Sequence, residues 1–199
     1  MGPHEQLALK DDVMRMLVQK YGKLRPEIKD KFFGLIEAVV WQQLSWKAAS
    51  AVVARLRSIG TTPESIVAHS SILTGVGLSR RKVEYIISIA KAVEQGTLDL
   101  EALTWKSDDE VLATLTTMRG IGEWTAQMYL IFCLRREDVL PAGDLGVRKA
   151  IGRLYFNGSV PDRKQVLQLG EKWKPVRTYA TIYLWKSGTN DSTIPVLTV

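Results

Sequence analysis

Apolar residues recur at steps of three and four along most of this 199-residue chain, which is the spacing of one face of an α-helix. Clear runs of this kind occupy residues 13–21 and 32–40. Strand patterns rich in valine and threonine are missing except in the last residues, 194–199. We therefore predict an all-α protein, in which residues 194–199 form a tail or a short extended piece.

Helix start and stop signals agree with this periodicity. Candidate N-caps precede five segments: Ser45, Thr62, Ser79, Ser107 and Asp162. Pro63 suits the first helical position, and Glu110 and Gln165 stand three residues after their caps, as in a capping box. Gly60 and Gly96 mark the ends of two helices.

Composition narrows the class of protein. With 46% hydrophobic and 24% charged residues the chain reads as a soluble protein, and it has no apolar run of the ~18–20 residues that a membrane span needs. No targeting segment is recognisable, so we expect a cytoplasmic, nucleoid-associated protein, or a nuclear one in a eukaryote. The net charge of +6 suits a polyanionic partner without requiring one. A single cysteine, Cys133, excludes an internal disulfide and a four-cysteine zinc or iron–sulfur site.

The segment 135–143 combines charge with Pro141 and Gly143 between two strongly helical stretches. We expect the chain to cross there between two helical lobes with an active-site cleft between them, since clefts between lobes are common ligand sites. The predicted lobes are residues 31–136 and residues 1–30 joined with 137–199.

A glycine hairpin, Gly120-Ile121-Gly122, stands between a helix that begins near Ser107 and another over residues 123–134. Glycine permits positive φ and close approach of the backbone, and the amides that start the next helix can hold a phosphate. A buried Ile121 would fix the hairpin to its helices. The same residues also fit an ordinary corner between two helices.

The hairpin resembles the helix-hairpin-helix element of DNA-repair glycosylases, and residues 140–144, Leu-Pro-Ala-Gly-Asp, resemble the Gly/Pro-rich loop that ends in an aspartate in those enzymes. Within that superfamily the chain is most similar to the 3-methyladenine DNA glycosylase II (AlkA-type) enzymes. The resemblance spans about residues 30–186 in order and is carried by residues 40–45, 76–82, 120–126, the loop to Asp144, and 173–185.

This resemblance implies a role for specific residues. Asp144 corresponds to the catalytic carboxylate, and the implied base pocket is lined by Trp124 and Trp185, with Trp41, Trp46 and Tyr129 as weaker candidates. Met128 stands where some relatives have a tyrosine that faces the pocket. The implied DNA contacts are Gly120, Gly122 and Thr125 at the hairpin and either Gln43 or Leu44 as the side chain inserted into the duplex.

Each of these residues also has a plainer interpretation. Asp144 can simply be an N-cap, the tryptophans can be core residues, and Leu44 can close the core between two helices. Trp105 and Trp173 look like packing residues. The basic residues either add charge for DNA or form solvated faces; they are Arg80, Arg81, Lys82, Arg148 and Lys149.

The resemblance also indicates which reaction and which cofactors to expect. Relatives that cleave the DNA strand carry a lysine nucleophile where this chain has Trp124, so a Schiff base is impossible at that position. The cluster-bearing branches are excluded by the single cysteine, and no cofactor is required. Family hairpins often hold a monovalent cation, Na⁺ or K⁺, here through the backbone carbonyls of Thr116, Met118 and Ile121.

The expected function is therefore that of a monofunctional glycosylase of base excision repair. Cleavage of the N-glycosidic bond develops positive charge on the deoxyribose, which a nearby carboxylate stabilises. The expected partner is double-stranded DNA that contains alkylated purines, 3-methyladenine or 7-methylguanine. We expect the protein to be a monomer and to have no membrane partner. The alternative is a non-catalytic helix-hairpin-helix module that binds damaged or abasic DNA. A structural or partner-binding helical protein is a third, poorer option.

Overall fold

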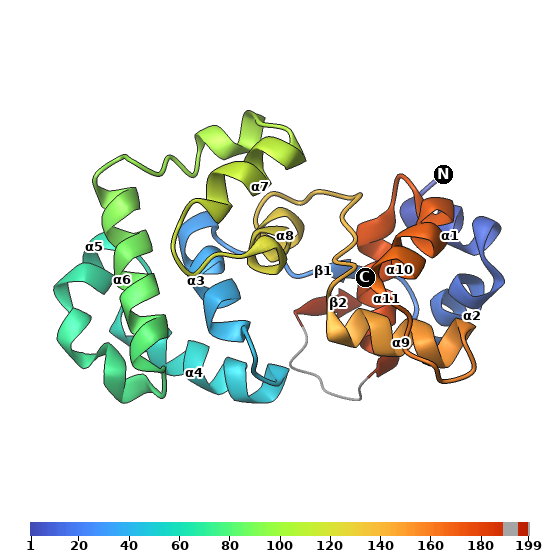
Figure 1. Cartoon of the computed structure of the whole chain (residues 1–199), viewed down its shortest axis with the longest axis horizontal. Coiled ribbons are helices and arrows are strands. Elements are labelled where there is room, and N and C mark those ends of the chain that lie inside the picture. The colour runs from blue at the N-terminus through green and yellow to red at the C-terminus, as the bar shows by residue number, and fades with distance from the viewer. Residues whose placement is uncertain (189–194, 199) are drawn as a thin grey trace. The chain divides into compact units, whose positions relative to one another are not determined.

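The computed structural model describes residues 1–188 and 195–198, and helices make up most of it (Figure 1). The chain divides into two compact units, Met1–Glu27 with Arg135–Val199 and Ile28–Leu134. The boundaries thus lie at 27/28 and 134/135, where the sequence suggests 30/31 and 136/137. The predicted all-α class is confirmed. No helix in the described residues is long and apolar enough to cross a membrane.

The unit Ile28–Leu134 is built around one buried helix. Its helices, with η for 3₁₀ turns, are α3 (Lys31–Trp41), α4 (Trp46–Ile59), α5 (Pro63–Ala68), η1 (Ser70–Val76), α6 (Arg80–Glu94), η2 (Ala102–Trp105), α7 (Asp108–Thr116) and α8 (Glu123–Phe132). Every residue of α3 after its first is buried, and α3 packs against α4, α6 and α8. Glu37, buried in this helix, forms ion pairs with Lys29 at 3.3 Å and Arg57 at 2.7 Å.

The other unit joins both ends of the chain. Its elements are α1 (Pro3–Lys10), α2 (Asp12–Tyr21), β1 (Leu24–Pro26), α9 (Leu145–Tyr155), α10 (Arg163–Gly170), η3 (Glu171–Trp173), α11 (Arg177–Gly188) and β2 (Val196–Thr198). Helix α11 lies beside α9, and it also packs against α2 and β1 (Figure 1). Strands β1 and β2 pair antiparallel, with Leu24 opposite Thr198. The short extended piece predicted near the C-terminus is therefore confirmed over 196–198, whereas Ile194 and Val199 lie outside the described residues.

A buried carboxylate ties this unit together. Asp11 caps α2 by accepting the amides of Val13 and Met14, and its second oxygen accepts from Tyr155, Lys172 and Trp173, each at 2.8 Å. Burial alone would raise the pKa of Asp11, but these donors outweigh it and lower the pKa below its ordinary value. The predicted packing role of Trp173 is confirmed, since this residue is fully buried.

Local signals located the helix starts correctly. All five predicted N-caps accept a hydrogen bond from an amide of the helix that they precede, and Ser107 and Asp162 form the expected capping boxes. The expectation for Trp105 is wrong, because its side chain is 89% exposed at the end of η2. A four-residue 3₁₀ turn is too short to present a continuous apolar face, so its last residue need not face the core.

Candidate functional site

The hairpin between α7 and α8 contains a glycine that the fold itself requires. Gly120 has φ of 93°, a left-handed conformation that suits glycine. A Cβ atom at this position would lie 2.2 Å from ring carbons of Tyr85, which comes from α6. Ile121 is buried, as predicted, and its amide donates to the carbonyl of Met118 at 3.0 Å. The hairpin is therefore held by its own turn and by the Tyr85 ring.

Gly122 differs from Gly120, because nothing in the described chain demands a glycine there. Its φ of −97° is open to any residue, and a Cβ would meet none of the described atoms within 4 Å. It is exposed at the N-cap of α8 and, as a glycine, supplies no side-chain cap. The first amides of a helix have no intrahelical acceptor and favour anions. The approach to the first turn of α8 is thus unobstructed by any side chain at residue 122.

The loop of residues 42–45, between α3 and α4, presents two side chains to solvent. Gln43 has φ of 58°, which is uncommon for a residue with a side chain. Leu44 is 41% exposed, and its amide donates to the carbonyl of Trp41 at 3.2 Å. Leu44 therefore does not close the core between the helices, and the choice between Gln43 and Leu44 as the inserted side chain stays a prediction.

Behind this loop, the side chain of Gln42 bonds to the hairpin. Its amide donates to the Gly120 carbonyl at 2.8 Å and to the Thr125 hydroxyl at 2.7 Å. Thr125 is 2% exposed, so its hydroxyl acts inside the unit, on Gln42. Sequence reasoning missed Gln42, although a polar amide directly after an apolar helix was a usable signal.

The aromatic candidates of this unit differ in burial. Trp41 is buried and packs edge-to-face on Trp46 at a ring distance of 5.3 Å, and Trp46 and Trp124 are partly exposed. Met128 and Tyr129 are both fully buried. Burial raises the pKa of the Tyr129 phenol far above its ordinary value, and its hydroxyl has no hydrogen-bond partner among the described residues. Trp46 and Trp124 are thus the candidates of this unit with partly open surface.

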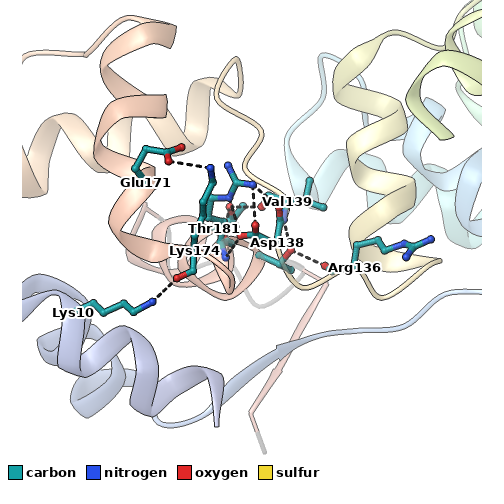
Figure 2. Close-up of polar contacts among 9 residues, drawn as sticks. Lys10, Arg136, Asp138, Val139, Glu171, Lys174 and Thr181 are labelled. Carbon is teal, nitrogen blue, oxygen red and sulfur yellow. Dashed lines mark hydrogen bonds and ion pairs between the residues drawn. The ribbon is translucent and has the colours of Figure 1, made fainter. Parts of the chain in front are cut away.

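In the other unit, the segment that leads to Asp144 is fastened to the first turn of α11. Arg177 grips both carboxylate oxygens of Asp138, at 2.7 and 2.9 Å. The Thr178 hydroxyl donates to the Arg136 carbonyl and accepts the Val139 amide. Figure 2 shows these contacts clustered around Asp138 and Val139. The segment 136–139 therefore has a fixed position relative to α11.

Asp144 follows this segment and caps α9. One carboxylate oxygen, Oδ1, accepts the Val147 amide at 2.7 Å and the indole N–H of Trp185 at 3.1 Å. Trp185, on α11, is 4% exposed. The N-cap interpretation of Asp144 is therefore correct, and it is compatible with a catalytic one, because both donors orient the carboxylate.

Gly146 is a further residue that sequence reasoning missed. A Cβ there would lie 3.0 Å from Oδ1 of Asp144 and 3.4 Å from Cδ1 of Trp185. Any larger residue would press on the contact between these two side chains. A glycine in the first turn of a helix, where it has no turn to make, was the available signal.

Ligands for a divalent metal are not apparent. In residues 1–188 and 195–198, no group of three or more His, Cys, Asp or Glu side chains could hold a metal ion. Backbone carbonyls are a different donor set. At the end of α7 the Thr114 carbonyl accepts the Thr117 amide and the Leu115 carbonyl accepts the Met118 amide, and carbonyl oxygens of this kind suit hard cations.

Comparison with known proteins agrees with this picture. A model of the HhH-GPD superfamily of base excision DNA repair proteins matches residues 36–175. DNA-3-methyladenine glycosylase 1 of Schizosaccharomyces pombe is 39% identical over 94% of this chain and 87% of its own length. DNA-3-methyladenine glycosylase 2 of Escherichia coli is 26% identical over 83% of this chain and 62% of its own. The similarity is thus greater to the fission-yeast protein.

Solved structures lead to the same family. The fission-yeast 3-methyladenine DNA glycosylase, solved in complex with abasic DNA, superposes with a TM-score of 0.86 at 37% identity, covering 92% of this chain and 95% of that one. The 3-methyladenine DNA glycosylase of Archaeoglobus fulgidus gives a TM-score of 0.83 at 32% identity, over 94% and 70% of the two chains. The chain therefore belongs to the HhH-GPD superfamily of base excision DNA repair proteins.

Proposed function

We propose that the protein is a monofunctional DNA glycosylase that removes alkylated purines, such as 3-methyladenine and 7-methylguanine, from double-stranded DNA. The observation that carries the proposal is the arrangement at Asp144, whose carboxylate is oriented by the Val147 amide and the Trp185 indole. The relatives named as DNA-3-methyladenine glycosylases support the substrate class, and the fission-yeast structure with abasic DNA supports DNA as the partner.

In this proposal Asp144 stabilises the positive charge that develops on the deoxyribose as the bond to the base breaks. A carboxylate already held in place needs no reorganisation at that moment. An alkylated purine leaves readily because it is cationic, so binding by an aromatic face helps more than a general acid would. Trp124 is the candidate face, and a tryptophan attracts a cation by about 0.5–2 kcal/mol.

The proposal excludes strand cleavage through a Schiff base. That reaction needs an amine nucleophile at the position held by Trp124. Borohydride, which reduces a Schiff base to a stable amine, should therefore trap no covalent complex between the protein and abasic-site DNA. A clear covalent adduct on a denaturing gel would contradict this part of the proposal.

DNA would be gripped at the hairpin by the amides next to Gly122. A monovalent cation, held by the carbonyls of Thr116, Met118 and Ile121, would add positive charge beside a phosphate. The carbonyl of Met118 accepts the Ile121 amide and retains one lone pair for such an ion. We expect a monomer that works in the compartment of the genome, the nucleoid or the nucleus.

The test is release of methylated base from alkylated duplex DNA by the unmodified protein and by Asp144→Asn. The variant keeps the shape of the side chain but loses its charge, and we expect release to fall by a factor of at least about 100. The matched control is Asp162→Asn, because Asp162 also caps a helix of the same unit, through the Gln165 amide. The control should keep both its stability and its activity, because asparagine caps a helix about as well as aspartate.

A second candidate function is a module that binds damaged DNA without cutting it. It would need the hairpin and the 42–45 loop but not the carboxylate of Asp144. Tight binding of abasic DNA by the unmodified protein, together with no release of either methylated purine, would favour this module over the enzyme.

A further inference from the structure

A polar junction joins three elements of the hairpin-bearing unit, α3, α6 and the hairpin. The side chain of Gln42 reaches from the end of α3 to the Gly120 carbonyl and the Thr125 hydroxyl, at 2.8 and 2.7 Å. The carbonyl of Gly120 needs a donor, so the amide nitrogen faces it. Since Gly120 belongs to the hairpin turn and Thr125 to the first turns of α8, one side chain spans both parts of the candidate phosphate site.

Lys82 completes the junction from the side of α6. Its ammonium group donates to the carbonyls of Val40 and Gln42, at 2.7 and 2.6 Å, where α3 ends. Burial lowers the pKa of Lys82 below its ordinary value. Three residues later, and so on the same face of α6, Tyr85 packs against Gly120. Helix α6 thus contacts both the end of α3 and the hairpin.

These contacts lie directly beside the exposed part of the 42–45 loop. Gln42 is anchored through its side chain and its carbonyl, and Ser45 is anchored as the cap of α4, where its hydroxyl accepts the Ala48 amide. Between these anchors, Gln43 has a left-handed backbone and Leu44 is exposed. A residue with a side chain persists in such a backbone conformation when its surroundings enforce it.

We propose that Gln42 and Lys82 are positioning residues that lock the 42–45 loop to the hairpin, so that gripping the phosphates and inserting a side chain into the duplex occur together. The inference rests on the proposed function, because it assigns the loop to insertion and the hairpin to DNA binding. It goes further by giving Lys82 a position-fixing contact with α3 in place of a contact with DNA.

The test uses a duplex with 2-aminopurine next to an abasic-site analogue, because 2-aminopurine brightens when it loses its stacking. The first variant is Gln42→Met, which keeps the length of the side chain and removes its donors. The second is Thr125→Val, which removes the acceptor in an isosteric side chain. The matched control is Gln95→Met, a similar change at the exposed end of α6.

Both junction variants should lower the 2-aminopurine response by about five- to tenfold, the factor expected for one or two lost hydrogen bonds. Affinity for undamaged duplex should stay within about twofold of the unmodified protein, because hairpin amides grip phosphates regardless of sequence. Gln95→Met should change neither. A uniform loss of affinity for all duplexes would overturn the proposal, because Gln42 would then serve the hairpin alone.

A double-mutant cycle with Leu44→Ala tests the coupling between junction and loop. If Gln42 acts through the loop, Gln42→Met should have little further effect on the response once Leu44 is truncated. Independent, additive effects of the two changes would refute the coupling.

Lys82→Met gives a separate readout. It should reduce the response like Gln42→Met while the slope of log affinity against log salt stays unchanged, whereas loss of one phosphate contact would reduce that slope by about one. A reduced slope would show that Lys82 contacts DNA.

None of these measurements requires bond cleavage. A protein that releases no base but unstacks 2-aminopurine would contradict the glycosylase proposal and leave the junction standing, and one with no response at all would overturn the junction.

Discussion

Replacing Trp185 by phenylalanine separates the packing of its aromatic ring from the hydrogen bond that it donates to Asp144. Phenylalanine keeps an aromatic ring on α11 but cannot donate to Asp144, whose Oδ1 atom now accepts the indole at 3.1 Å. Hydrogen bonds to charged groups contribute about 1.5–3 kcal/mol. Because 3.1 Å is longer than the about 2.7–2.9 Å of strong charge-assisted bonds, we take the low end of that range. A loss of about 1.5 kcal/mol in the transition state slows base release about tenfold.

The assay is single-turnover release of 3-methyladenine from methylated duplex DNA, with protein in excess. The matched control is Trp173→Phe, because Trp173 is another buried tryptophan of the same unit that donates to a carboxylate, Asp11, at 2.8 Å. Both variants should be less stable in urea, and Trp185→Phe alone should slow base release.

Two results would refute the reasoning. An unchanged rate for Trp185→Phe would mean that the amide of Val147 suffices to orient Asp144. A loss greater than about a thousandfold exceeds what one hydrogen bond can supply, and it would assign Trp185 a direct role in binding the base.

Three other perturbations follow from the contacts of the described residues. Gly122→Ala should weaken DNA binding, measured by fluorescence anisotropy, and should cost less than about 1 kcal/mol of stability in urea, because alanine is a poorer N-cap than glycine. Gly120→Ala should cost more than about 1 kcal/mol because of its positive φ and the Tyr85 ring. Asp11→Ala should cost about 3–5 kcal/mol in urea, since it leaves buried donors unpaired. Burial, and after it the charge of Lys23, lowers the pKa of His4 in the folded protein below the ordinary value of 6.5. Just below pH 6.5 the unfolded chain therefore binds more protons than the folded one, so the free energy of unfolding should fall as the pH drops through that value. His4→Gln should flatten this dependence, and an unchanged pH profile would contradict it.

Helix starts could be predicted from the sequence because their causes are local. Ser45 and Ser107 each bond an amide three residues away, so the motif and its physical effect lie within one turn. Strand β1 could not be predicted, because Leu24–Pro26 is stabilised by Val196–Thr198 at the other end of the chain. Three residues carry no periodicity, and a pairing across most of the chain has no local signal.

The contacts of the candidate site could not be predicted from the sequence for the same reason. The resemblance named Asp144 and Trp185 separately, but the hydrogen bond that links them joins residues 41 positions apart on two helices. Gln42 is similar, since its partners Gly120 and Thr125 are 78 and 83 positions away. In both cases the sequence could indicate the chemical groups, and only their packing shows which group acts on which.

The charge of the chain takes on a different meaning once these partners are known. Several basic side chains serve the fold: Arg57 pairs with Glu37, Arg177 with Asp138, Lys172 with Asp11, and Lys82 bonds to the end of α3. The three ion pairs remove as many negative as positive charges and leave the net charge of +6 unchanged, but these four basic side chains are engaged within the fold. Backbone amides at the Gly122 turn, the phosphate site of the proposed function, do not have this limitation, because backbone amides can bind phosphate without a charged side chain. Phosphate contacts of this kind carry no sequence information, which suits a protein that must find a rare damaged base in any sequence.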